Sequence, residues 1–123
     1  MGITQYAPRQ PMNSHERRRF PRYDVGRLPG VLDGFRLFET LKLSAGGALI
    51  RLPAELSLGE RVKVSLELGD SIFRSAAQIV FVGPDMGTAG LYRIGLAFVE
   101  TPPEETAELS EYIDRSLAAG ELR

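Results

Sequence analysis

Residues 61–68 alternate strictly between polar and apolar side chains, and this pattern constrains the fold more than any other stretch. The four apolar members are Val62, Val64, Leu66 and Leu68. A period of two places them on one face of a β-strand, and that face has to be buried. The following Gly69-Asp70 suits a two-residue hairpin turn with glycine first, so an antiparallel partner strand is expected directly afterwards.

Two later segments continue the alternating pattern. In each of them apolar side chains recur at even spacing and define one predicted face of a strand. These positions are Phe73, Ala77, Ile79 and Phe81 in residues 72–82, and Tyr92, Ile94, Leu96 and Phe98 in residues 91–99. We expect two strands here, separated by a loop at residues 83–87.

Two shorter segments precede residue 61. Residues 35–44 are predicted to form a strand whose apolar face is interrupted by Glu39; that face comprises Phe35, Leu37, Leu41 and Leu43. A tight turn at residues 44–47 follows, and its two glycines tolerate backbone angles that other residues avoid. Residues 48–52 are predicted to resume as a strand that stops at Pro53.

The last segment changes to a helical period. Thr101 as N-cap, Pro102 at the first helical position and Glu104 at the third form a predicted capping box, and Gly120 is the predicted helix end. The apolar residues that recur at helical spacing are Leu109, Tyr112, Ile113 and Leu117. Short strands, tight turns and one amphipathic helix indicate an all-β fold, a small antiparallel barrel with a C-terminal α-helix.

Length and composition exclude several classes of protein. A chain of 123 residues is long enough for one domain with a modest core and too short for two. The absence of cysteine excludes disulfides, thiolate zinc sites and cysteine nucleophiles. No stretch approaches the roughly 20 apolar residues of a membrane span, and residues 1–13 lack the apolar core of a signal peptide. These features predict a cytoplasmic protein.

Groups that could perform catalysis are not gathered anywhere in the sequence. The only histidine, His15, has no neighbouring base or nucleophile, and the carboxylates show no metal-ligand spacing. Gly46-Gly47 is followed by Ala48 and not by the lysine of a phosphate-binding loop. We therefore expect a binding protein and not an enzyme, with no metal and no cofactor.

Arginine is concentrated ahead of the predicted strands. It outnumbers lysine 13 to 2 in the whole chain, and four guanidinium groups fall within residues 17–22. Residues 1–36 hold seven basic and three acidic side chains, whereas residues 100–123 hold two basic and seven acidic ones. Only arginine presents a planar fork that binds phosphate or a guanine edge and also stacks on a flat ring. Together with a serine hydroxyl and a glycine backbone at the 44–47 turn, the arginines favour a guanine dinucleotide as ligand.

These two places resemble the motifs of the PilZ domain family. Residues 18–22 (RRFPR) are similar to the RxxxR motif, and with Arg17 they form the longer RRxxxR version. Residues 42–47 (KLSAGG) resemble the second motif, D/N-x-S-x-x-G. The apolar-Gly-apolar ending at residues 93–98 agrees as well, so the resemblance extends over residues 16–101, most of the chain.

The resemblance implies a six-stranded antiparallel barrel that binds cyclic di-GMP, a bacterial second messenger. Arg18 and Arg22 would grip guanine edges and phosphates from a flexible loop that closes over the ligand. Arg17 matches the extra arginine associated with an intercalated ligand dimer, and Ser44 and Gly47 would complete the site from the turn. The resemblance also implies an effector that relays the messenger to an unidentified protein of motility, polysaccharide export or transcription.

Lys42 departs from the family pattern, which has Asp or Asn at this position. A carboxylate or amide accepts hydrogen bonds from the ring N–H and exocyclic amine of guanine, whereas lysine only donates. Losing one such bond in a desolvated site costs about 1–3 kcal/mol, on the order of 5- to 150-fold in affinity. A contact between Lys42 and a phosphate would recover part of this cost, so we expect binding that is retained but weakened.

Two alternatives to a receptor stay open. The departure at Lys42 favours a degenerate PilZ domain with weak or no nucleotide binding that acts as a protein-interaction adaptor. A basic arm that binds nucleic acid without sequence specificity predicts steep salt dependence and no preference for the cyclic dinucleotide.

The expected organisation has two parts. Residues 1–15 are predicted to be a flexible N-terminal segment, and residues 16–120 a single PilZ-like domain. Within that domain we expect the barrel at about 31–100 and the helix at about 102–119. Gly26, Pro29 and Gly30 predict an irregular connection between the arginines and the first strand.

Overall fold

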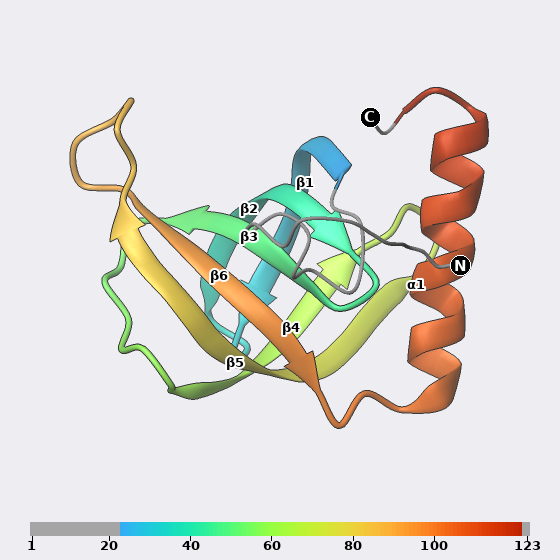
Figure 1. Ribbon diagram of the computed structural model, residues 1–123, viewed down its shortest axis with the longest axis horizontal. Coiled ribbons are helices and arrows are strands. Elements are labelled where there is room, and N and C mark those ends of the chain that lie inside the picture. The colour runs from blue at the N-terminus through green and yellow to red at the C-terminus, as the bar shows by residue number, and fades with distance from the viewer. Residues whose placement is uncertain (1–22, 122–123) are drawn as a thin grey trace, which may run out of the picture.

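The computed structural model describes residues 23–121, with side chains from residue 28 onward, and this part of the chain forms six strands and one helix. In chain order they are β1 (Tyr23–Leu32), β2 (Arg36–Ser44), β3 (Gly47–Leu52), β4 (Arg61–Glu67), β5 (Ile72–Pro84), β6 (Tyr92–Val99) and α1 (Pro103–Ala118). Every strand is antiparallel to its neighbours, and the ring closes in the order β1-β2-β3-β6-β5-β4 (Figure 1). The predicted all-β barrel with a C-terminal helix is confirmed.

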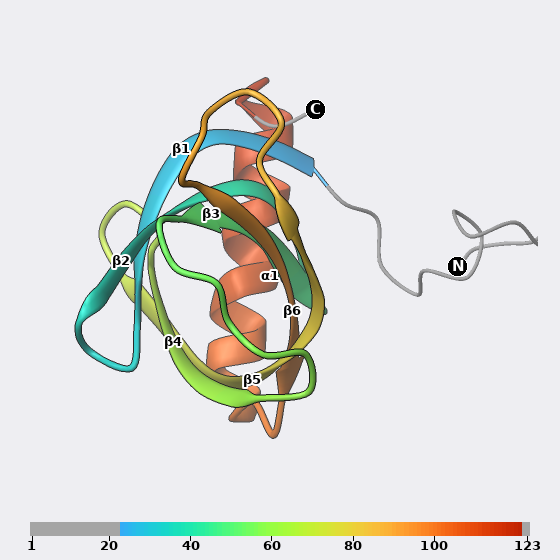
Figure 2. The same cartoon turned by 90° about the vertical axis from the view of Figure 1, so that its left-hand side faces the viewer.

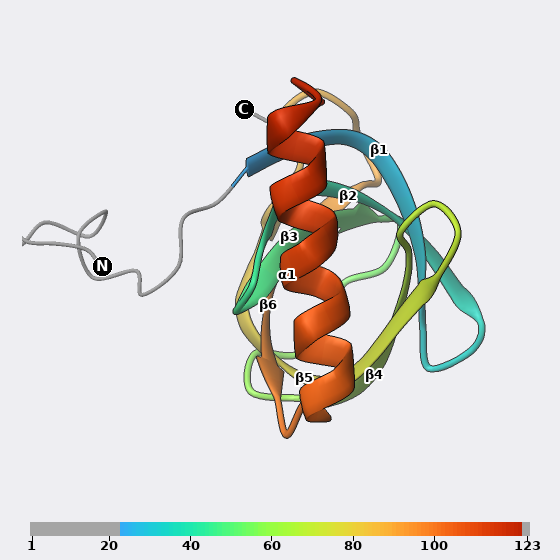
Figure 3. The same ribbon diagram turned by 90° about the vertical axis from the view of Figure 1, so that its right-hand side faces the viewer.

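The two ends of the barrel are covered differently. Since β3 and β4 stand on opposite sides of the ring, the connection at residues 53–60 has to cross one end (Figure 2). At the other end β6 leads into α1, which lies across the opening (Figure 3). Leu109 and Ile113 of α1 are buried in the same apolar cluster as the strand residues, so the helix completes the core. In the described part of the chain no helix is long and apolar enough to cross a membrane.

Strand β4 and the hairpin after it follow the sequence pattern. All four predicted inward residues of β4 and its extension, Val62, Val64, Leu66 and Leu68, are buried. Gly69 has a φ of +83°, and the N–H of Leu68 donates to the carbonyl of Ser71 at 2.8 Å, as a two-residue hairpin with glycine first requires. The alternation in β6 is also confirmed: Ile94 and Leu96 are buried, and Tyr92 and Phe98 pack against the core from the same face.

The predicted apolar face of β2 is wrong over its first half. Phe35 and Leu37 are 69% and 74% exposed, and Phe38 and Thr40 are buried instead. One extra residue, Leu41, lies between the pairs that Thr40 and Lys42 make with β3. Such a bulge moves all later residues to the opposite face, and so Leu43 points inward as predicted while Leu37 does not.

A second bulge corrects the prediction for β5. Ile79 is buried as expected, but Phe81 is 50% exposed. The register with β6 shifts between these two residues, with Val80 as the extra one. The ring of Phe81 therefore lies outside the barrel over Gly83, where a Cβ would approach the ring to 2.9 Å.

Strand β1 replaces the irregular connection that Gly26, Pro29 and Gly30 predicted. The barrel thus begins at Tyr23 and not near residue 31. Hydrogen-bonded pairing with both β2 and β4 overrides the local preference of glycine and proline for turns. The register with β2 is interrupted between Asp24 and Leu28, so the irregularity survives as a bulge within the strand.

The predicted capping box of α1 is wrong. The N-cap is Pro102, no side chain caps the helix, and the Thr101 hydroxyl lies 2.7 Å from that of Ser75. The end at Gly120 is confirmed: it has a φ of +76°, and the N–H of Glu121 donates to the carbonyl of Ser116 at 2.8 Å. On the buried face Leu109 and Ile113 are as predicted, whereas Ser116 is buried in place of the exposed Leu117.

Because one face of α1 is in the core, replacing two of its leucines by alanine should lower the free energy of unfolding by unequal amounts. Leu109→Ala should lower the free energy of unfolding by about 2–5 kcal/mol, because Leu109 is fully buried and its loss leaves a cavity. Leu117→Ala is the matched control and should cost less than about 1 kcal/mol. Urea denaturation followed by circular dichroism measures both; equal losses would contradict the assigned packing.

Candidate functional site

Ser44 organises the turn between β2 and β3. Its side chain is buried, and its Oγ accepts hydrogen bonds from the N–H groups of Gly46 at 3.2 Å and Gly47 at 3.1 Å. The same hydroxyl donates to the carbonyl of Gly47 at 3.3 Å. A hydroxyl has one proton and two lone pairs, so all of its hydrogen-bonding capacity is used inside the turn. Ser44 therefore fixes the shape of this turn.

Gly47 is required by the close approach of β3 and β6. A Cβ at this position would lie 2.0 Å from the carbonyl oxygen of Leu96, and the N–H of Phe98 donates to the carbonyl of Gly46 at 2.9 Å. Neither Gly46 nor Gly47 has a positive φ. The predicted reason for the two glycines, unusual backbone angles, is thus wrong for both, and Gly47 serves to bring two strands together.

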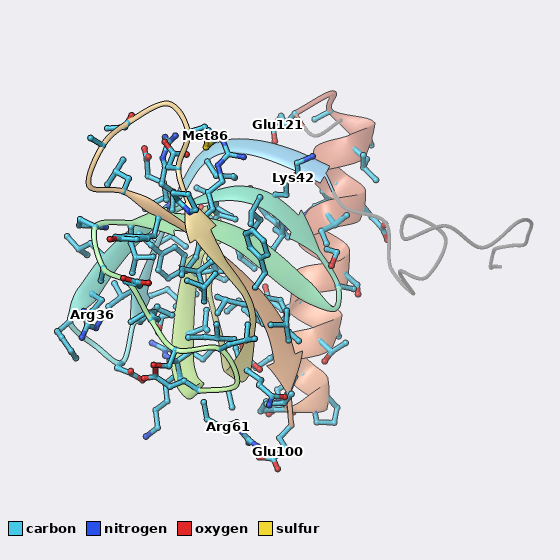
Figure 4. The ribbon with its side chains drawn as sticks, turned by 60° about the vertical axis from the view of Figure 1, so that its left-hand side comes forward. Arg36, Lys42, Arg61, Met86, Glu100 and Glu121 are labelled. Carbon is cyan, nitrogen blue, oxygen red and sulfur yellow. The ribbon has the colours of Figure 1, made fainter. Side chains whose placement is uncertain are left out.

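Lys42 lies on the outer surface of β2, just after the bulge. It is exposed, and it is directly opposite Asp24 of β1 on one side and Leu49 of β3 on the other. Figure 4 shows Lys42 well away from the exposed pair of Arg61 and Glu100, whose Nη2 and Oε1 atoms are 2.9 Å apart. One hairpin, formed by β2 and β3, carries Lys42, Ser44 and Gly47, as their spacing predicted.

The three predicted arginines, Arg17, Arg18 and Arg22, lie outside the described residues, as does the predicted flexible segment at 1–15. What the structure fixes is the point at which the chain after Arg22 joins the barrel. Tyr23 pairs with Leu43, and so the first residue of β1 lies directly beside the strand that carries Lys42 and Ser44.

Two glycines lie in the strand pair next to the turn. On the strand pair β3–β6, Gly47 is opposite Ala97 and Leu49 is opposite Gly95. Gly95 leaves room for the Cβ of Phe81, which would lie 2.9 Å from a Cβ on the glycine. Both glycines are buried, so their role is to let parts of the barrel approach one another closely.

A row of alternating charges was missed by the sequence reasoning. Nη2 of Arg51 lies 2.7 Å from Oε1 of Glu39, and Nη1 of Arg51 lies 3.7 Å from Oδ1 of Asp85. Nε of Arg93 donates to the same Asp85 oxygen at 2.8 Å. The row follows from register, since Glu39 is opposite Arg51 and Arg51 is opposite Arg93. The sequence separates these residues, and only the strand order brings them together.

The ion pairs in this row shift the pKa values of two of its residues. The hydrogen bond from Arg93 holds the pKa of Asp85 below its usual value, against the opposing effect of burial. The hydrogen bond to Glu39 likewise raises the pKa of Arg51. This row anchors the β5–β6 loop, and among the described residues no cluster of three or more His, Cys, Asp or Glu side chains could hold a metal ion.

Comparison with known proteins gives one family and several related folds. A model of the PilZ domain family matches residues 16–115, whereas a search of curated proteins found no match. Among solved structures, YcgR from Escherichia coli in complex with c-di-GMP superposes with a TM-score of 0.73 at 21% identity, covering 85% of this chain and 48% of that chain. The PilZ domain of the same protein with c-di-GMP gives 0.68 at 22% identity, covering 85% and 93%. The inhibitor of motility MotI/DgrA from Bacillus subtilis gives 0.69 at 21% identity, covering 83% and 52%.

These comparisons establish a shared fold over different lengths of chain. The chain spans about half the length of MotI/DgrA and of full YcgR, at 52% and 48%, and nearly all of the isolated YcgR domain, at 93%.

The close contact between β3 and β6 at Gly47 predicts that adding one methyl group there strongly destabilises the fold. Gly47→Ala should lower the free energy of unfolding by about 1–3 kcal/mol or more, because the methyl group meets the backbone oxygen of Leu96, which cannot rotate away. Gly87→Ala is the control, since its Cβ would meet only Oδ2 of Asp85 at an ordinary 3.7 Å. Urea titration of both variants tests this, and a Gly47→Ala protein as stable as Gly87→Ala would refute it.

The lowered pKa of Asp85 predicts a dependence of stability on pH. A carboxyl whose pKa is lower in the folded state stabilises the fold above its unfolded pKa, about 3.9, and loses that contribution as pH falls through the folded value. Asp85→Asn should therefore destabilise the protein at pH 7, and its difference from wild type should shrink below about pH 4. Unfolding at a series of pH values measures this, with the exposed Asp114→Asn as control. A difference that stays constant down to acid pH would contradict the ion pairing.

Proposed function

Because this chain belongs to the PilZ domain family, whose model matches residues 16–115, we propose that it is a cytoplasmic receptor for cyclic di-GMP. The observation that carries the proposal is the register of Tyr23 with Leu43, which joins the arginine segment to the barrel beside the Ser44–Gly47 turn. The two motifs lie 20 residues or more apart in sequence, and this pairing supports their acting as one site. The complexes of YcgR with c-di-GMP support the choice of ligand.

The proposed binding mode divides the ligand between the two motifs. Arg18 and Arg22 bind guanine edges and phosphates through their planar forks, and Arg17 contacts a second ligand molecule stacked on the first. The turn held by Ser44 supplies a small, rigid surface, and Gly47 brings β3 close to β6 beside it. Arginine is suited to both tasks because it binds anions and stacks on purine rings.

We propose that ligand binding is signalled by a change in the surface formed by the chain ahead of β1. Arginines that bind the ligand draw the segment before Tyr23 over the outer face of the β2–β3 hairpin, and this closed arrangement is what a downstream protein recognises. Motility, polysaccharide export and transcription machineries are the candidate recipients.

The lysine at position 42, where the family has Asp or Asn, favours a second function, a protein-interaction adaptor without nucleotide binding. The residue is exposed on the same hairpin as Ser44 and carries only donors, where guanine recognition calls for an acceptor. In this reading the barrel presents a fixed surface, and cyclic di-GMP has no effect on partner binding.

Isothermal titration with cyclic di-GMP tests the proposal and separates it from the alternatives. We expect saturable binding to the wild type, and at least about tenfold weaker binding to Arg18→Ala and to Arg22→Ala, since each loses a charge-assisted contact. Arg74→Ala is the matched control, because Arg74 is an exposed arginine on β5, away from the hairpin, and should bind as the wild type does.

The remaining outcomes identify the other functions. Absence of binding to the wild type at high ligand concentration eliminates the receptor and selects the adaptor. Binding that is equally strong for single-stranded RNA and falls steeply with salt selects the nonspecific nucleic-acid arm.

A further inference from the structure

Phe81 presents a large aromatic ring to solvent on the outer face of β5. It is half-exposed because the bulge at Val80 turns it away from the core, and bulges of this kind often direct a side chain toward a site. Val80 is exposed beside it, and Cγ2 of Val80 would lie 3.6 Å from a Cβ on Gly95. Adjoining exposed apolar side chains, unlike scattered ones, are typical of surfaces that bind another molecule.

Two glycines fix the position of the Phe81 side chain. A Cβ on Gly83 would lie 2.9 Å from Cζ of Phe81, and a Cβ on Gly95 would lie 2.9 Å from Cβ of Phe81. A side chain at either glycine would therefore push the phenylalanine aside. Within the described residues no other aromatic ring and no cation lies against Phe81. The ring is thus held in place without an aromatic or cationic partner.

Strand register aligns Phe81 with the proposed ligand site. Lys42 of β2 is opposite Leu49 of β3, Leu49 is opposite Gly95 of β6, and Gly95 is opposite Phe81 of β5. Lys42 and Phe81 are exposed and Leu49 is partly exposed, so this row follows the outer surface of the barrel. Because neighbouring strands are about 4.7–4.9 Å apart, the row measures roughly 14 Å from the backbone of β2 to that of β5.

The proposed ligand has two flat bases that need to be covered. Cyclic di-GMP carries one guanine on each side of a ring of two sugars and two phosphates. The residues assigned to the site so far are arginines, a lysine, a serine and a glycine, none of which is aromatic or aliphatic. A base that extends along the row from the β2–β3 hairpin would reach the apolar surface around Phe81, where its face can be buried.

We propose that Phe81 stacks on one guanine of cyclic di-GMP, with Leu49 and Val80 bordering the base. The inference rests on the proposed function and adds to it the residue that covers the base lying over β5. Stacking recognises the face of a base and not its edge, so Phe81 contributes to affinity and leaves the choice of base to other groups.

Phe35, another strongly exposed phenylalanine, does not suit this role. The guanidinium of Arg36 already lies over its ring, 5.0 Å from the centroid. Phe35 directly precedes β2, whereas Ser44 ends that strand, so the length of β2 separates it from the proposed site. It is therefore a matched control for Phe81.

A fluorescent reporter tests stacking directly. The chain contains no tryptophan, so Phe81→Trp introduces a single indole at the proposed position. Titration with cyclic di-GMP should quench its emission saturably, with the same midpoint that isothermal titration gives for this variant. The emission of Phe35→Trp should stay unchanged over the same range of ligand.

Affinities of two further variants separate stacking from packing. Phe81→Ala should bind cyclic di-GMP on the order of 5- to 150-fold more weakly, the range expected for the loss of one stacked base. Phe81→Leu keeps an apolar side chain but no aromatic face, and it should also bind more weakly than the wild type. Thermal melting followed by circular dichroism establishes that each variant is folded.

The outcomes distinguish failure of this inference from failure of the proposed function. If the wild type binds cyclic di-GMP and folded Phe81→Ala binds equally well, Phe81 has no role in recognition although the receptor stands. If Phe81→Leu binds as the wild type does, or if the two tryptophan reporters respond alike, Phe81 does not stack on the ligand and the inference is overturned. If the wild type does not bind cyclic di-GMP at all, the proposed function itself fails, and this inference with it.

Discussion

The barrel is closed by only three residue pairs between β1 and β4, and this closure depends on the absence of a side chain at Gly30. A Cβ there would lie 2.2 Å from Cζ of Phe38 and 2.7 Å from the carbonyl oxygen of Ser65. Gly30 thus lets an aromatic ring fill the interior directly beneath β1 while the strand still pairs with β4. Without this seam the six strands would form an open sheet with two unpaired edges. The position of β1 beside β2, on which the proposed site depends, is set by the pairs that these two strands make along their own hairpin.

Sequence pattern predicted the strands well where the backbone is regular and poorly where it is not. In β4 no residue is inserted, so simple alternation identified every inward side chain. In β2 and β5 a single extra residue, Leu41 or Val80, reverses the faces, and nothing in the composition of either strand marks where the insertion falls. Strand β1 was missed because glycine and proline favour turns locally, whereas pairing on both sides decides its conformation. The helix end at Gly120 was predictable because it depends on one residue and its immediate neighbours.

For the candidate site, sequence identified the residues of the turn but gave the wrong reasons for some of them. Gly47 was expected to supply an unusual backbone angle, and it supplies a close contact between β3 and β6 that no local pattern reveals. The charge row from Glu39 to Asp85 depends on the order and register of strands far apart in the chain. The row that joins Lys42 to Phe81 is of the same kind, since it depends on strand order and on the bulge in β5.

The helix shares its buried residues with the barrel, and this limits how the protein can transmit information. Leu109 and Ile113 lie in one apolar cluster with the interior of the strands, so releasing α1 would open the core to water. Barrel and helix should accordingly unfold as a single cooperative unit, and α1 is unsuited to act as a detachable arm. The solvent-facing side of α1 therefore keeps a fixed position relative to the strands.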